Sequence, residues 1–147
     1  DDSMNTIHLI CLGVKELAAS RKFYKAIGFD EPNDKMADTI VFFNNTGTKL
    51  ELFPYDELLK DIGIKAEDNP MPTTFNGVTH AYNAKSKEEV DTVFENAQQN
   101  GAVIVKQPVW GDWCGYSGYF QDPNGYYWEV AYSKDWQYDE HDMLVIE

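Results

Sequence analysis

Two glutamates, Glu51 and Glu129, have the types and spacing that most directly suggest chemistry in this sequence. Each stands four residues after a turn glycine, Gly47 or Gly125, and each is followed by apolar residues typical of a continuing strand. Close carboxylates repel, so one of a pair tends to keep its proton, and the pair can work as an acid–base couple or bind a cation. Alternatively, each glutamate only accepts hydrogen bonds from tyrosines or backbone amides. If the protein is an enzyme, these two are its candidate catalytic residues.

A glycine-interrupted aromatic segment, residues 110–120, is the densest chemical feature of the chain. Glycines let flat rings approach a ligand closely, and aromatic walls beside acidic groups suit planar or cationic molecules. We therefore include Trp113 and Tyr116 among the predicted ligand-binding residues. The other interpretation is that these rings only fill a core. Trp128 and Tyr132 should lie on the opposite strand face from Glu129, packed under helices.

Composition excludes several classes of function. The net charge of −13 over 147 residues opposes binding to nucleic acid or to anionic lipid. No apolar run approaches the roughly 20 residues that a membrane helix needs, and no secretion signal opens the sequence. Residues 1–3 precede Met4, which looks like the natural start. Cys11 and Cys114 form no metal-binding motif and are expected to be reduced thiols in a cytoplasmic protein.

The elements that must position these residues fall into two similar halves. In the first half, strands are predicted at residues 6–14, 38–43 and 49–53, with helices at 15–27 and 55–64. A linker follows at 65–74, which contains Pro70 and Pro72. In the second half, strands are predicted at 78–84, 103–106, 115–121 and 127–132, with a helix from a capping box at Ser86 to about Gln99. The acidic tail, residues 134–147, should be partly docked.

Two motifs on these elements resemble the vicinal oxygen chelate superfamily, which includes glyoxalases, bleomycin-resistance proteins and extradiol dioxygenases. The opening motif is Leu-Gly-Val-Lys-Glu-Leu at residues 12–17. The closing motif, Gly-Tyr-Phe-Gln-Asp-Pro-Asn-Gly at residues 118–125, runs into Glu129 and is the more specific of the two. The resemblance spans roughly residues 6–133.

The resemblance implies an α+β fold. In this superfamily two tandem βαβββ modules form a curled mixed sheet around a central cavity, with the helices outside. Here the modules would cover about residues 4–64 and 75–133 within one domain, residues 4–147. The resemblance also implies a homodimer, because exposed sheet edges need to be covered.

Metal-dependent relatives hold a divalent ion with residues from the first and last strand of each module. Glu51 and Glu129 match the last-strand positions. The first-strand histidine stands five residues before the valine that begins the turn into the helix, and that count reaches Leu9 and Thr79. His8 and His80 are each one residue away, so they should face the helix layer unless a bulge turns them inward. His141 has no predicted role.

The resemblance therefore predicts a cavity without a complete metal site, because two carboxylates hold a divalent ion poorly without a third ligand. The predicted ligand-binding residues are Leu9, Cys11, Glu51, Phe53, Thr79, Asn83, Trp113, Tyr116 and Glu129. The expected function is binding of a small, cationic or planar molecule, with no cofactor. The alternative is a metal-dependent lyase, isomerase or dioxygenase that uses Glu51 and Glu129 with His8 or His80. A third hypothesis, an interaction protein whose acidic tail is the partner surface, has less support.

Overall fold

The computed structural model describes residues 3–32 and 38–147, and the chain divides into two compact units, residues 1–71 and 72–147. The boundary between the units lies within the predicted linker, residues 65–74. The expectation for residues 1–3 falls mainly on Asp1 and Asp2, which are outside the described residues. The described helices are all too short or too polar to span a lipid bilayer.

The first unit contains a three-stranded mixed sheet. Its elements are β1 (Leu9–Val14), α1 (Leu17–Ala26), β2 (Val41–Phe42), β3 (Lys49–Pro54), α2 (Tyr55–Ile62) and a 3-10 turn, η1 (Ala66–Asp68). The strand order is β1-β3-β2, in which β1 and β3 are parallel and β2 is antiparallel to β3. Helix α1 ends where predicted, and Gly28 follows with a φ of 119°, a conformation that glycine adopts without strain.

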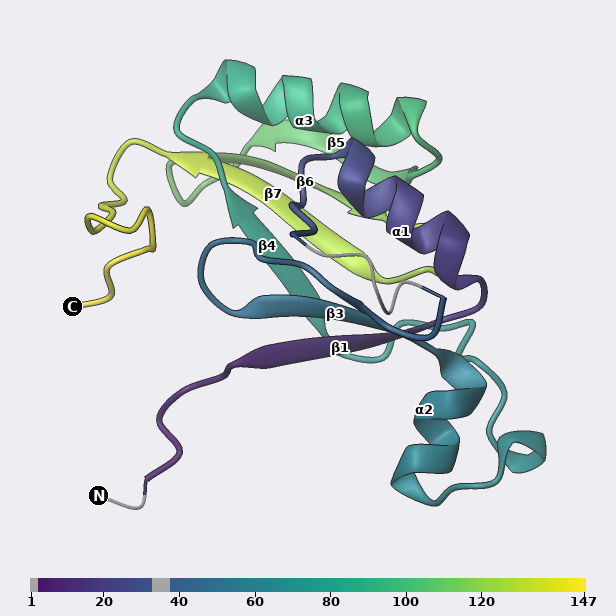
Figure 1. The fold of residues 1–147 in the computed structure, drawn as a ribbon. Helices are drawn as coiled ribbons and strands as arrows, with labels where there is room; N and C mark the ends of the chain where they lie inside the picture. The colour runs from purple at the N-terminus through teal and green to yellow at the C-terminus, as the bar shows by residue number, and fades with distance from the viewer. Residues whose placement is uncertain (1–2, 33–37) are drawn as a thin grey trace. The chain divides into compact units, whose positions relative to one another are not determined.

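The second unit contains a complete βαβββ module. Its elements are β4 (Thr79–Asn83), α3 (Lys87–Gln99), β5 (Val103–Trp110), β6 (Gly115–Gln121) and β7 (Tyr127–Ser133). The strand order is β4-β7-β6-β5, in which only β4 and β7 run parallel. Figure 1 shows α3 lying along one face of this sheet, and α3 contacts β5, β6 and β7.

The α+β class and the mixed sheets are confirmed, but the two halves are not equally complete. Among the described residues, the first unit has three strands where a βαβββ module has four. Its β2 is also much shorter than the predicted strand at 38–43, because only Val41 and Phe42 pair with β3. In the second unit, β5 continues past Lys106 to Trp110, although Pro108 lies inside it. Proline is tolerated there because β5 is an edge strand.

Local signals in the second unit act as the sequence predicts. Ser86 Oγ accepts a hydrogen bond from the Glu89 backbone N–H at 3.0 Å and so caps α3. The turn between β6 and β7 is held by Asp122, whose Oδ1 accepts from the backbone N–H groups of Asn124 and Tyr126 at 2.8 and 2.9 Å. This turn fixes where β7 begins, and therefore which face Glu129 occupies.

The tail is partly docked on the second unit, as expected. Trp136 stacks on Trp113 with ring centroids 5.5 Å apart, and Asp142 forms an ion pair with Lys85. An isolated antiparallel bridge joins Tyr138 to Leu144 within the tail.

Candidate functional site

In the first unit, Glu51 lies beside Cys11 on one face of the sheet. The parallel register of β1 and β3 pairs these two residues, and it pairs Leu12 with Leu52 on the other face. Leu12 and Leu52 are buried in the core together with Tyr24 of α1. Glu51 and Cys11 therefore point away from the core that α1 covers.

The Cys11 thiol and the Glu51 carboxyl share a hydrogen bond, and each alters the other's ionisation. Burial raises the pKa of the Cys11 thiol to about 12, and the Glu51 carboxylate adds to the rise. Burial also raises the pKa of Glu51, the hydrogen bond with Cys11 opposes this, and nearby Asp61 adds to it. Cys11 is thus a protonated donor at neutral pH, and Glu51 is a carboxyl with an increased tendency to hold its proton.

Helix α2 flanks this same face at the end of β1. A Cβ placed on Gly13 would lie 2.9 Å from Cδ1 of Tyr55 and 3.2 Å from Cδ2 of Leu58. Gly13 therefore allows α2 to pack closely, and α2 also carries Asp61, whose charge acts on Glu51. This acidic contribution was not predicted, because the sequence does not indicate on which face α2 packs.

In the second unit, Glu129 occupies the equivalent place. The parallel register pairs Ala81 of β4 with Glu129, as Cys11 of β1 pairs with Glu51. The predicted match of the two glutamates is therefore confirmed. On the antiparallel side, Glu129 pairs with Tyr119, whose hydroxyl donates to Oε2 of Glu129 at 3.3 Å. Burial raises the pKa of Tyr119, and the Glu129 charge contributes, so this hydroxyl remains a donor.

The opposite face of the second sheet is covered by α3. Phe120 and Trp128 stack with ring centroids 6.5 Å apart, and Phe94 of α3 meets Phe120 edge-on at 5.9 Å. Val130 is also buried on this side. The predicted packing of Trp128 under the helix layer is confirmed, so Glu129 lies on the face that α3 leaves uncovered.

The histidines do not share these faces. His80 pairs with Trp128, and the two rings lie 5.1 Å apart on the side of α3, as predicted. Burial lowers the pKa of His80, and Asp122 partly opposes this effect. His8 is exposed and precedes β1, where its backbone oxygen accepts from Lys49 N–H. The register makes Leu9 equivalent to Thr79, so His8 lies one residue before that position and His80 one residue after it.

Neither half, taken alone, fits a divalent metal ion. Across the described residues, no group of three or more His, Cys, Asp and Glu side chains is placed to hold one. The face of Glu51 adds one protonated thiol, and the face of Glu129 adds one phenol. These donors suit hydrogen bonding to a ligand better than metal coordination, which needs three or four converging nitrogen, oxygen or thiolate ligands.

The structure sorts the predicted ligand-binding residues into groups. By strand register, Leu9, Cys11 and Phe53 share the face of Glu51, whereas Thr79 and Asn83 share the face of Glu129. Tyr116 is not on the face of Glu129, because its hydroxyl donates to Asp91 of α3 at 2.6 Å.

The aromatic segment lies mainly outside the two glutamate faces. Trp113, near the tip of the β5–β6 hairpin, stacks on Trp136 and remains half-exposed. Trp110 contacts Tyr116 and Tyr132 with centroids 5.3 and 6.4 Å apart. Of the eleven residues 110–120, Tyr119 is the one whose side chain reaches Glu129. Tyr119 was not among the predicted ligand-binding residues. Pairing the predicted strands 115–121 and 127–132 across their turn would have placed it opposite Glu129.

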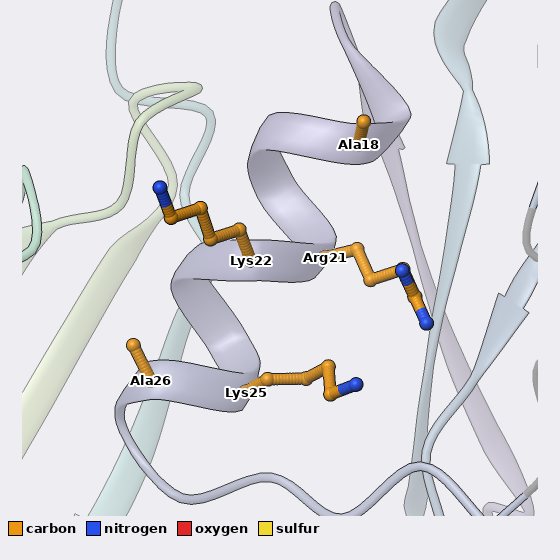
Figure 2. Close-up of a pocket in the computed structure, with 5 residues that line it drawn as sticks. All are labelled: Ala18, Arg21, Lys22, Lys25 and Ala26. Carbon is orange, nitrogen blue, oxygen red and sulfur yellow. The ribbon is translucent and has the colours of Figure 1, made fainter.

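A hollow of about 590 Å³ beside α1 was also not predicted. Figure 2 shows its lining residues, which are Ala18, Arg21, Lys22, Lys25 and Ala26. Arg21 and Lys25 both approach Glu31 Oε1, at 2.7 and 3.5 Å, and the side chain of Glu31 is buried. Lys22 extends to the other side of the helix from these two (Figure 2), so the three cations do not converge on one point.

Comparison with known proteins agrees with the arrangement of strands. A model of the Glyoxalase/Bleomycin resistance protein/Dioxygenase superfamily matches residues 6–130. A glyoxalase-related enzyme from Fulvimarina pelagi has a similar structure, with a TM-score of 0.84 and 22% identity, over 97% of this chain and 99% of that one.

Two further solved structures are similar. A glyoxalase/bleomycin resistance protein/dioxygenase from Nocardioides has a TM-score of 0.74 and 26% identity, over 92% of this chain and 87% of that one. A lactoylglutathione lyase from Agrobacterium tumefaciens has a TM-score of 0.64 and 24% identity, over 91% and 98%. A search of curated protein sequences found no significant match.

Proposed function

The chain belongs to the Glyoxalase/Bleomycin resistance protein/Dioxygenase superfamily, and from this premise we propose that it binds a small organic molecule with an amine or another cationic group. The observation that carries the proposal is the equivalent placement of Glu51 and Glu129. Each is paired with the first strand of its own unit and lies on the sheet face that α1 or α3 leaves uncovered.

The surroundings of the two glutamates support a cationic ligand. Among the described residues, neither glutamate has an ion-pair partner within its own unit. Both are half-buried, and a partly desolvated carboxylate without a counter-charge gains from binding a cation. Cys11 and Tyr119 each add a protonated group that orients a carboxylate and leaves its remaining lone pairs for a ligand.

The proposal does not require a complete metal site or a cofactor. His80 lies on the opposite sheet face, and the donors beside each glutamate are a thiol and a phenol. A metal-dependent lyase or dioxygenase of the glyoxalase type would need further ligands. A cytoplasmic location, a homodimer and the lack of nucleic-acid and membrane partners remain predictions of the same proposal.

A thermal-shift screen with primary amines and planar organic cations tests the proposal. We expect at least one amine, such as n-hexylamine, to raise the melting temperature of the wild-type protein in a dose-dependent manner. Glu129→Gln and Glu51→Gln should each weaken this stabilisation, because the amide keeps the shape of the side chain but removes its charge. Glu95→Gln, at an exposed position of α3, is the matched control and should leave the response unchanged.

The same thermal-shift screen distinguishes amine binding from the alternative, a metal-dependent enzyme. Ni²⁺, Zn²⁺, Mn²⁺ and Fe²⁺ are added singly, and the metal content of the purified protein is measured. Stabilisation by a metal that disappears in both Glu→Gln variants would favour the alternative and contradict a metal-free site. If no amine or planar cation stabilises the protein, the proposed function is wrong.

A further inference from the structure

A row of three polar side chains crosses the second sheet on the face of Glu129. The register pairs Glu129 of β7 with Tyr119 of β6, and Tyr119 with Lys106 of β5. Residues directly opposite each other in neighbouring strands project to the same face. Lys106 therefore stands in line with the carboxylate, one strand beyond the tyrosine that hydrogen-bonds to it.

Lys106 reaches this face because β5 is bulged. Ile104 pairs with Phe120, but the next pair is Lys106 with Tyr119, so Val105 is an extra residue on β5. In a regular ladder Val105 would stand opposite Tyr119. A second register shift follows before Val109, so Lys106 lies between two irregularities. Bulges commonly redirect a side chain, and here the bulge places an ammonium group where an aliphatic side chain would have been.

The backbone of the bulged strand β5 packs directly against Gly118. A Cβ on Gly118 would lie 2.5 Å from the backbone oxygen of Lys106 and 2.8 Å from the backbone nitrogen of Pro108. It would also lie 2.8 Å from Cζ of Phe94. The backbone of β5 thus occupies the space of a side chain at this position, and only glycine allows it.

Lys106 also differs from two other lysines of the same unit. Lys85 forms an ion pair with Asp142, and Lys87 forms one with Asp91 at 3.0 Å. Within the described part of this unit, Lys106 has no such acidic partner and is exposed. Its position in β5 is two strands away from Glu129, about 10 Å at the usual strand spacing, so the backbone keeps the two charges apart.

We propose that Lys106 determines ligand specificity by binding a carboxylate on the same small molecule whose amine binds Glu129. The ligand class is therefore a zwitterion with separated charges, such as an ω-amino acid, with its chain lying across Tyr119. This inference rests on the proposed function, because it assumes that Glu129 binds the cationic end. It adds a second anchoring group, on β5, and an orientation for the ligand.

Titration calorimetry with three probes of matched length tests the inference. The probes are 6-aminohexanoate, n-hexylamine and hexanoate. We expect 6-aminohexanoate to bind most tightly, n-hexylamine more weakly and hexanoate weakest. Lys106→Met should weaken 6-aminohexanoate binding roughly three- to fivefold, the range of an exposed ion pair, and leave n-hexylamine unchanged. Glu129→Gln should weaken both amine-containing probes.

Lys87→Met, on the side of α3, is the matched control and should not change any of the three affinities; thermal melts confirm that each variant is folded. If n-hexylamine binds and depends on Glu129, but 6-aminohexanoate binds no more tightly or is unaffected by Lys106→Met, the role of Lys106 is wrong and the proposed function stands. If n-hexylamine does not bind, or binds independently of Glu129, the proposed function itself fails.

Discussion

At the scale of single residues, Cys11 is held in an environment that opposes ionisation. Burial and the adjacent Glu51 carboxylate raise the pKa of its thiol to about 12, whereas Cys114 is an exposed free thiol. Thiolates are the reactive species, so Cys11 should react slowly at neutral pH. A half-buried, protonated donor of this kind orients a carboxylate, and a reactive nucleophile is not expected at this position.

Thiol labelling checks this directly. In Cys114→Ser, the remaining Cys11 should react with a disulfide reagent far more slowly than Cys114 does in Cys11→Ser. Adding Glu51→Gln to Cys114→Ser should speed the reaction, because removing the negative charge lowers the pKa of the thiol. Equal rates for both thiols in the folded protein would contradict the structure; unfolding in guanidinium, which should equalise them, is the control.

His80 predicts a pH dependence of stability. Its pKa is lowered in the folded state by burial, so the folded protein favours the neutral ring and the unfolded chain takes up the proton first. The contribution of His80 is fully present above its ordinary pKa of 6.5 and is lost as the pH falls through the lower folded value. The negative charge of Asp122 acts in the opposite direction and reduces the effect.

Urea unfolding at pH 7 and pH 5 measures the contribution of His80 to the free energy of unfolding. The wild-type protein should lose more unfolding free energy between these values than His80→Gln, whose side chain does not titrate. His141→Gln, in the exposed tail, should behave as the wild type does. An equal pH dependence in wild type and His80→Gln would show that His80 is not desolvated in the folded state.

At the scale of elements, the irregular edge strand β5 depends on Gly118. Gly118→Ala would place a Cβ within 2.5–2.8 Å of β5 backbone and of Phe94. We expect a loss of about 1–3 kcal/mol in the free energy of unfolding, the usual cost of overpacking. Denaturant unfolding checks the loss, and Thr92→Ala, at an exposed position of α3, should cost far less. A stability equal to that of the wild type would mean that β5 is not bulged over Gly118.

The sequence predicted the face of some strand residues and not of others. Local signals placed the strand that carries Glu129, because the turn at Asp122–Gly125 and the alternation after it fix the face of each residue. The sequence could not show on which face Tyr116 lies, for a physical reason. An aromatic residue in a strand fits either face, and its contact with Asp91 depends on where α3 packs. The sheet face of Lys106 could not be predicted, because no local sequence pattern indicates the bulge at Val105.

At the scale of the whole molecule, the chain is a duplication whose copies have diverged. The parallel pairs Cys11–Glu51 and Ala81–Glu129 show the shared plan. The first copy places a thiol and the charge of Asp61 beside its glutamate, whereas the second places Tyr119. The net charge of −13 gives the protein a negative electrostatic potential overall, which attracts cations. The two glutamates are therefore equivalent in position but differ in the groups that surround them.

The C-terminal tail, residues 134–147, is expected to stabilise the second unit without changing the oligomeric state. Ending the chain at Ser133 removes Trp136, which stacks on Trp113, and Asp142, which pairs with Lys85. We expect the unfolding free energy to fall by roughly 1–2 kcal/mol, as for the loss of a packed aromatic pair, and Trp113 fluorescence to shift to longer wavelength. Sedimentation should show an unchanged oligomeric state. A truncation that alters assembly would instead make the tail an interface.

The proposed function requires that the faces of Glu51 and Glu129 bind the cationic end of a ligand. Backbone amide spectra recorded by NMR during titration with n-hexylamine test this claim most directly. We expect the largest chemical-shift changes at Glu51, Glu129 and Tyr119, with little change at the opposite-face residues Leu52 and Trp128. No shift at either glutamate, or shifts confined to the α1 face around Lys22, would contradict it.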